Sequence, residues 1–241
     1  MTEGWREFWN RDTPIYVNPR HKALHYEGIA ADIAALLPQA SLPQASLPHD
    51  RAVVLDHGCG EALSADRVAK ACARLYLLDA APLVRTRLAA RFRSVPAVAV
   101  IAPDDLAAIP DASLDLVVAN SLAQYLSRDE LVGLLRIWRA KLAPAGRLVL
   151  ADILPPDLSA VADARALLAF AARGGFLPAA ILGLARTAFS DYRRLRGALG
   201  LARYDAAAML ALLAEEGFRG RRLARNLGHN QNRLAFEAVP G

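Results

Sequence analysis

Residues Asp56–Gly60 (DHGCG) form the part of the chain whose types and spacing point most directly to chemistry. They follow a short apolar run, residues 53–55, and precede a predicted helix over residues 64–73. Glycines in such a turn let the backbone approach a bound ligand closely. Asp79 ends the next apolar run, 21 positions after Gly58, and this spacing lets a carboxylate reach the hydroxyls of a ribose. The pattern predicts a nucleoside-containing cofactor beside the carboxyl ends of parallel strands.

Two classes of cofactor use this layout. A dinucleotide-binding loop has the pattern G-x-G-x-x-G, in which the third glycine lets the following helix pack closely on the strand. Leu63 occupies the position of that third glycine, so the sequence disfavours NAD. An NAD-dependent oxidoreductase stays as the weaker alternative.

The elements that must position these residues are indicated by alternating apolar strands and helices. Nearly continuous apolar strands fit burial on both faces of a sheet, and their alternation with helices predicts an α/β fold with a doubly wound, mostly parallel, seven-stranded Rossmann-like sheet. The predicted strands cover residues 53–55, 75–78, 97–101, 116–119, 148–153, 221–223 and 233–238. The predicted helices cover residues 23–37, 64–73, 82–92, 129–142, 160–172, 179–199 and 205–216.

The order of these elements divides the chain into four parts. Residues 1–50 are predicted to form a helical extension and a proline-rich linker, which contains the tandem repeat LPQAS-LPQAS. Residues 51–154 are the predicted cofactor-binding core, residues 155–203 a helical lid inserted after the fifth strand, and residues 204–241 the C-terminal part of the sheet. Proline at the spacing of the repeat cannot continue a helix, which is why we expect a surface linker there.

The glycine loop resembles the first motif of the class I S-adenosylmethionine-dependent methyltransferases, D-x-G-x-G-x-G, with Ala62 in place of the last glycine. Residues 75–82 (LYLLDAAP) resemble the second motif of that family. Residues 109–125 (IPDASLDLVVANSLAQY) are similar to a stretch of the ubiquinone- and menaquinone-type small-molecule methyltransferases, and residues 142–153 (LAPAGRLVLADI) resemble the passage into the fifth strand. The resemblance covers residues 51–153 in order and in spacing.

The resemblance implies that the chain is an enzyme with S-adenosyl-L-methionine as its cofactor, and that a small, in one interpretation lipophilic, molecule receives the methyl group. A non-catalytic module that only binds this cofactor is a further alternative. Residues 120–123 lack the two prolines and the aromatic residue of nucleobase methyltransferases, so a nucleic acid substrate is disfavoured. The implied cofactor-binding residues are Asp56, Gly58, Cys59, Gly60, Asp79, Ala80, Asp104, Asp105, Asn120 and Ser121.

The candidates for the acceptor side lie in residues 16–26, in residues 124–125 and in the polar segment 228–232. A general base is needed if the acceptor is a hydroxyl or an acidic carbon. The N-terminal segment could close over the site as a lid, or it could be a solvated helix face. The candidate bases are His21, His25 and His229, and the candidate substrate or lid residues are Tyr16, Arg20, Tyr26, Gln124 and Tyr125.

The insertion, residues 155–203, combines an apolar face with a basic end. Packing on the domain core is the common fate of such a face. The alternative is a lid for a lipophilic substrate, or a helix that contacts an anionic membrane surface peripherally. The apolar residues are Phe170, Phe176, Leu177, Ile181, Leu182, Leu184 and Phe189, and the arginines are Arg186, Arg193, Arg194 and Arg196.

The bulk properties set limits on these hypotheses. The chain has 241 residues and a formal net charge of +5, which suits one α/β domain with an insertion. Cys59 and Cys72 are its two cysteines, so we expect a reduced compartment and no disulfide framework. The N-terminus lacks the apolar core of a signal peptide, and the longest apolar run, residues 176–185, has about half the length that a membrane-spanning helix needs. The sequence therefore predicts a cytoplasmic protein, and no metal-ligand spacing is visible.

Overall fold

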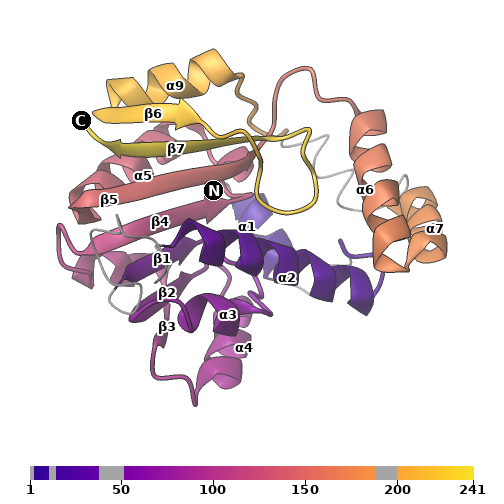
Figure 1. Ribbon diagram of the computed structural model, residues 1–241, viewed down its shortest axis with the longest axis horizontal. Helices are drawn as coiled ribbons and strands as arrows, with labels where there is room; N and C mark the ends of the chain where they lie inside the picture. The colour runs from indigo at the N-terminus through magenta and orange to yellow at the C-terminus, as the bar shows by residue number, and fades with distance from the viewer. Residues whose placement is uncertain (1–2, 11–14, 38–51, 188–199) are drawn as a thin grey trace.

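The computed structural model describes residues 3–10, 15–37, 52–187 and 200–241. Within them, seven strands form one sheet in the order β3-β2-β1-β4-β5-β7-β6 (Figure 1). Strands β1 to β5 run parallel to one another, whereas β7 runs antiparallel to β5 and to β6. The predicted doubly wound, mostly parallel sheet is therefore confirmed. The strands are β1 (Val53–His57), β2 (Arg74–Leu78), β3 (Val98–Ile101), β4 (Leu114–Asn120), β5 (Leu142–Ile153), β6 (Phe218–Arg222) and β7 (Leu234–Pro240).

Helices cover both faces of the sheet. The apolar side chains of α5 and α9 pack on one face, and those of α2, α3 and α4 pack on the other. Leu55 and Leu77, in the central strands β1 and β2, are fully buried, as expected for strands covered on both faces. The helices are α1 (Glu3–Trp9), α2 (Pro19–Leu36), α3 (Ala65–Ala69), α4 (Pro82–Phe92), α5 (Arg128–Lys141), α6 (Ala160–Gly174), α7 (Leu177–Thr187) and α9 (Ala206–Glu215), with 3-10 turns η2 (Pro103–Ala108) and η3 (Ala123–Tyr125).

Local sequence signals explain where several helices begin. Asn18 caps α2 by accepting a hydrogen bond from the backbone N–H of His21 at 2.8 Å, and proline occupies the first turn. Ser127 and Glu130 form a reciprocal capping box at the start of α5. Proline also begins α4, whose predicted limits agree with the observed ones.

Several predicted boundaries differ from the structure, among them those of the fifth strand and of the helices expected over residues 64–73 and 179–199. The expected turn at residues 144–146 lies within β5, in the irregular stretch between Leu142, which pairs with Leu114, and Arg147, which pairs with Leu116. The helix expected over residues 64–73 is shortened to the five residues of α3. The helix expected over residues 179–199 corresponds to α7 in its first part, and its remainder, with Phe189, Arg193, Arg194 and Arg196, lies outside the described residues, as does the linker from residue 38 to residue 51.

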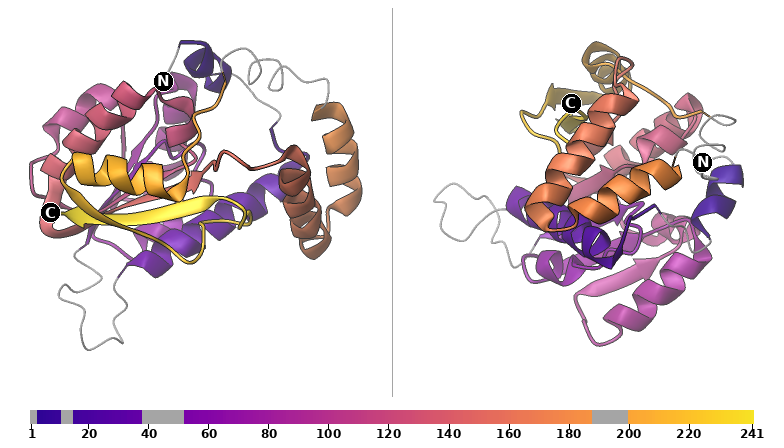
Figure 2. Two further views of the ribbon diagram at one scale, coloured as in Figure 1. Left: turned by 90° about the horizontal axis from the view of Figure 1, so that it is seen from above. Right: turned by 90° about the vertical axis from the view of Figure 1, so that its right-hand side faces the viewer.

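Helices α6 and α7 stand beside the carboxyl edge of the sheet, and α2 reaches from the body of the domain to them (Figure 2). Gly175, with φ of +71°, ends α6 in the left-handed conformation that glycine favours. Phe176 and Ala180 are buried in a small cluster with Leu24 of α2. Across the described ranges, no helix combines the length and the apolar character needed to cross a membrane.

Candidate cofactor and acceptor site

The glycine loop between β1 and α3 is folded back against the end of β2. Gly58 and Gly60 have φ angles of +78° and +57°, which glycine adopts at little cost. Ala62 has a φ of +38°, so the alanine that replaces the last glycine of the motif takes up a conformation suited to glycine. The backbone N–H groups of Gly58 and Cys59 donate to the carbonyl of Leu78 at 2.7 and 3.2 Å. These bonds join the ends of β1 and β2.

Asp79, directly after β2, ties the loop to the start of α4. One carboxylate oxygen accepts a hydrogen bond from the backbone N–H of Gly60 at 3.0 Å, and the other accepts one from Ala81 at 2.8 Å. Asp56 lies near the end of β1, where burial and the charge of Asp79 raise the pKa of its carboxyl to about 7. Burial also raises the pKa of Asp79. Two interacting, half-buried carboxyls at a sheet edge are typical of a functional site.

Tyr26 of α2 lies against the glycine loop. Its hydroxyl accepts a hydrogen bond from the backbone N–H of Glu61 at 3.0 Å. A Cβ atom on Gly60 would come within 2.7 Å of that hydroxyl, so the close approach requires glycine. Lys22, one turn earlier on α2, forms an ion pair with the Glu61 carboxylate. The predicted lid residue Tyr26 is thus a neighbour of the loop.

The end of β4 contributes Asn120 and Ser121. Ser121 has a φ of +57°, an uncommon conformation for a residue other than glycine, and such positions cluster at functional sites. The Asn120 amide donates to the Ser121 hydroxyl at 3.3 Å. Its Oδ1 atom is buried and, within the described residues, has no hydrogen-bond partner. An unpaired buried acceptor of this kind fits the ammonium group of a methionine moiety.

The three histidines expected as base candidates are brought together by the fold. Their ring centroids lie 6.0 to 6.4 Å apart, although His21 and His25 belong to α2 and His229 to the loop between β6 and β7. His21 stacks on Phe176 at 5.1 Å, and His229 stacks on Phe170 of α6 at 4.3 Å. No group of three or more His, Cys, Asp and Glu side chains among the described residues is arranged to hold a metal ion.

Burial makes all three histidines weak bases. Desolvation, with the neighbouring histidine as the second cause, lowers the pKa of His21 to about 4 and that of His25 to about 3. The pKa of His229 is also lowered, chiefly by desolvation. The Nδ1 atom of His21 accepts a hydrogen bond from the backbone N–H of Val17 at 3.3 Å, so its proton is on Nε2. At neutral pH the three rings are uncharged.

Tight local contacts position His229. Gly228 has a φ of +75°, and its backbone N–H donates to the Asp32 carboxylate of α2 at 2.7 Å. The side chain of Ile29 lies next to Gly228 as well. One helix, α2, therefore carries two histidines and holds the loop that carries the third.

The other predicted residues have varied surroundings. Arg20 donates to the carbonyl of Gly174, so its guanidinium holds the end of α6. Tyr16 packs against His25 and Tyr26, with ring centroids 5.4 and 5.9 Å away. Asp105 caps the turn η2 by accepting a hydrogen bond from the backbone N–H of Ala102, and Asp104 beside it is exposed. The carbonyl of Ala80 accepts a hydrogen bond from Arg85, and Cys59 of the glycine loop is buried. Gln124 is buried, and Tyr125 packs between Trp5 and Trp9.

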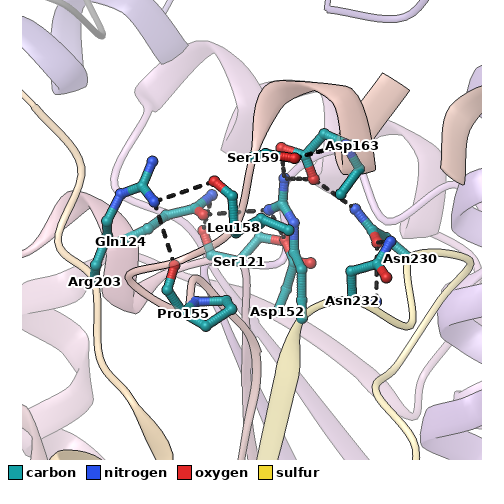
Figure 3. A network of polar contacts seen from close by, with 12 residues as sticks. Ser121, Gln124, Asp152, Pro155, Leu158, Ser159, Asp163, Arg203, Asn230 and Asn232 are labelled. Carbon is teal, nitrogen blue, oxygen red and sulfur yellow. Dashed lines mark hydrogen bonds and ion pairs between the residues drawn. The ribbon is translucent and has the colours of Figure 1, made fainter. Parts of the chain in front are cut away.

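A polar network next to the histidines was not predicted from the sequence (Figure 3). Asp152, near the end of β5, accepts hydrogen bonds from the Ser121 hydroxyl at 2.6 Å and from Arg233 at 2.9 Å. Arg233 also pairs with Asp163 of α6 at 3.3 Å, and Asn230 donates to the same carboxylate at 2.8 Å. The signal that could have identified Asp152 is an acidic residue closing an apolar strand, the same signal that identified Asp79.

Comparison with known proteins identifies this arrangement. The sequence profile of the family described as "Methyltransferase domain" matches residues 55–150, which include the glycine loop, Asp79 and Asn120. The chain contains a class I S-adenosylmethionine-dependent methyltransferase domain. The match decides against the dinucleotide alternative, and S-adenosylmethionine is the cofactor of the methyltransferase domain. A search of curated protein sequences found no significant match.

Several solved structures have the fold of this methyltransferase. Magnesium protoporphyrin IX methyltransferase from Synechocystis PCC 6803 with bound SAH is 18% identical, with 99% of this chain and 94% of that chain covered and a TM-score of 0.58. Mitomycin 7-O-methyltransferase is 19% identical, with 100% and 61% covered and a TM-score of 0.60. The YcgJ protein from Bacillus subtilis is 16% identical, with 83% and 71% covered and a TM-score of 0.53. At these identities the likeness concerns the fold.

Proposed function

We propose that the chain methylates a small, lipophilic molecule, which is bound beside the histidine cluster. The observation that supports this proposal is the composition of that cluster. His21, His25 and His229 lie among Tyr16, Phe170 and Phe176, and all three imidazoles are uncharged at neutral pH. Aromatic faces and uncharged rings suit an apolar or aromatic acceptor, and two solved structures of this fold are named as methyltransferases of small organic molecules.

The cofactor side follows the residues predicted from the motifs. We assign Asp79 to the ribose hydroxyls, because its carboxylate oxygens have lone pairs beyond those used by Gly60 and Ala81. Asp56 and the glycine loop face the methionine end, where Asn120 Oδ1 accepts from the ammonium group. The turn η2, with Asp104 and Asp105, lies after β3 at the adenine end.

The reaction depends mainly on alignment. When bound, the cofactor supplies a methyl group that a lone pair of the acceptor displaces from sulfur, and sulfur keeps the electrons of the broken bond. The chain holds the two reactants in line, an effect that can be worth roughly 7–11 kcal/mol. His25 and His229 are the candidates for accepting the acceptor's proton, because His21 already uses Nδ1 for the Val17 amide. Since the pKa of each is lowered, the proton must move as the new bond to the methyl group forms and not before it. The predicted insertion, residues 155–203, is the lid in this proposal.

The cofactor assignment is tested by calorimetry. S-adenosylhomocysteine should bind and NAD should not, and Asp79→Ala should weaken the binding at least tenfold. Asp66→Asn, on the exposed side of α3, is the matched control and should leave the binding unchanged. Tight binding of NAD, or an Asp79→Ala variant that binds as well as the natural protein, would contradict the assignment.

The acceptor assignment is tested with S-adenosylmethionine labelled on its methyl group and a cell extract as the source of acceptors. We expect the label in organic-extractable small molecules, and its appearance only in nucleic acid or protein fractions would overturn the proposal. His25→Phe and His229→Phe separate the two base candidates, since loss of a general base typically costs 10²- to 10⁴-fold in rate. The His21→Phe variant serves as the control for loss of cluster packing.

The same proposal includes peripheral contact of the lid with an anionic membrane surface. Ile181 and Leu182 of α7 are 57% and 51% exposed, Leu177 is 37% exposed, and Arg186 follows on the same helix. Apolar residues next to cations are typical of helices that lie on a membrane surface. Vesicles of phosphatidylglycerol and phosphatidylcholine should retain the protein at low ionic strength, and Leu182→Asp should release it. Ile137→Asp, at a 40% exposed site on α5, is the control; absence of binding by the natural protein would refute the membrane contact.

A further inference from the structure

Four neighbouring strands have polar residues at their carboxyl ends, which lie on the same side of the sheet. In the spatial order β2, β1, β4 and β5, these residues are Asp79, Asp56, Asn120 and Asp152. The first three belong to the proposed cofactor site. Since adjacent strands are about 4.8 Å apart, Asp152 lies one strand beyond Asn120 and roughly 10 Å from the strand of Asp56. Asp152 therefore lies next to the proposed cofactor site, on the side of the proposed acceptor site.

The position of the Asp152 carboxylate is defined by backbone and side-chain contacts. Asp152 has a φ of +60°, and its backbone N–H donates to Asn226 at 2.8 Å. Its neighbour in the network, Ser121, also has a positive φ. Uncommon backbone conformations at two adjacent strand ends indicate that the surroundings select them. Both side-chain bonds to Asp152, from Ser121 and from Arg233, fall on Oδ2, which leaves Oδ1 for a further donor.

The charges around Asp152 favour donors over anions. Arg233 is shared between Asp152 and Asp163, and Arg173 is a further cation close enough to lower the pKa of His229. His25 and His229, which face this network, are uncharged at neutral pH. Arg20, one of the five residues expected to bind substrate or form the lid, donates instead to the carbonyl of Gly174. A carboxylate on the acceptor would meet the carboxylate of Asp152, whereas an N–H or O–H group would meet a hydrogen-bond acceptor already held in position.

We propose that Asp152 binds the acceptor molecule by accepting a hydrogen bond, through Oδ1, from the N–H or O–H group that is methylated, and that the site therefore selects neutral or cationic acceptors over carboxylates. This inference rests on the proposed function, whose cofactor binding is measured separately. Ser121 and Arg233 act as positioning residues that orient the carboxylate. The stacked rings of His229 and Phe170 lie beside it and can pack on an aromatic acceptor.

Two naphthalene probes of similar size test the selectivity. Binding of 1-naphthylmethylamine and of 1-naphthoic acid is measured by calorimetry at pH 7 with protein saturated with S-adenosylhomocysteine. The amine should bind at least tenfold more tightly than the acid. Asp152→Asn should remove this preference, whereas Asp163→Asn, which removes an equal negative charge but leaves the Asp152 carboxylate in place, should still bind the amine more tightly than the acid. Equal or tighter binding of the acid, no binding of either probe, or an unchanged preference in Asp152→Asn would each overturn the proposal.

A third probe gives a result with the natural protein alone, in case Asp152→Asn does not fold. The N,N,N-trimethyl derivative of the amine keeps the positive charge but has no N–H group. It should bind at least tenfold more weakly than the primary amine if Asp152 accepts a hydrogen bond. Equal affinity would show that charge alone is recognised and would overturn the hydrogen bond. Failure of the natural protein to bind S-adenosylhomocysteine would instead contradict the proposed function.

Discussion

Replacement of Asp56 by asparagine should stabilise the protein that has no cofactor bound, and increasingly so as the pH rises. Burial and the neighbouring Asp79 raise the pKa of the Asp56 carboxyl from 3.8 to about 7. A carboxyl with a raised pKa in the folded state contributes stability below its unfolded pKa and loses that contribution as the pH rises through the folded value. The unfavourable effect of ionised Asp56 is therefore fully developed above about pH 8.

The difference between 3.8 and about 7 corresponds to roughly 4 kcal/mol in the free energy of unfolding. This value is an upper limit, because Asp56 is half-buried rather than sealed from water and because Asp79 titrates with it. Asp56→Asn should raise the stability by about 1–4 kcal/mol at pH 8.5 and by much less at pH 5. For a chain of this length each kcal/mol shifts the melting temperature by about 2–4 °C.

Thermal melting of the natural protein and of Asp56→Asn at pH 5 and at pH 8.5, without cofactor, measures this effect. Calorimetry with S-adenosylhomocysteine should show at least tenfold weaker binding to the variant, since the carboxylate faces the proposed methionine end. Asp66→Asn, in an exposed ion pair with Lys70, is the control and should shift the melting temperature little at either pH. A stability difference that does not grow with pH, or a variant that is less stable at pH 8.5, would refute the reasoning.

Three further predictions follow from individual contacts. Ala62→Gly should raise the free energy of unfolding, measured with denaturant, by about 0.5–1 kcal/mol. Glycine removes the strain of the left-handed backbone at φ +38°, and the greater freedom of the unfolded chain cancels only part of that gain. A less stable variant would contradict this account. Tyr26→Phe should weaken binding of S-adenosylhomocysteine by roughly fivefold, since the Glu61 N–H loses its partner and a net hydrogen bond contributes about 1 kcal/mol; unchanged affinity would show that Tyr26 does not support the cofactor site. Ser127→Ala should cost about 1 kcal/mol of stability through loss of the capping box of α5, with no change in cofactor affinity, and calorimetry together with thermal melting checks both parts.

The parts of the fold that the sequence predicted well are those governed by local rules. The limits of α4 follow from proline at its first turn, and the glycine loop follows from residues that tolerate positive φ. The turn expected at residues 144–146 coincides with the irregular stretch of β5, but the pairing of Leu142 with Leu114 before that stretch was not predicted. That outcome depends on the neighbouring strand, which no local pattern contains.

The candidate site likewise contains residues that local sequence patterns predict and contacts that only the tertiary structure creates. Asp79 and the glycine loop were found because their spacing is fixed by one strand-turn-helix unit. The three histidines were named individually, but their contact arises from the packing of α2 against a loop almost 200 residues later. Arg233 and Asp163 were missed because a charged pair that links the last strand to α6 has no signature in sequence spacing.

Helix α2 has a consequence for the binding of the two ligands. Within residues 21–26, about 8 Å of its length, Tyr26 contacts the glycine loop, His21 and His25 belong to the histidine cluster, and Leu24 packs against α6 and α7. A rigid helix that touches both ligand sites transmits a shift at one site to the other, and such coupling is reciprocal. We expect S-adenosylhomocysteine to change the affinity for an acceptor, and the acceptor to change the affinity for S-adenosylhomocysteine by the same factor, which calorimetry of each ligand with and without the other measures.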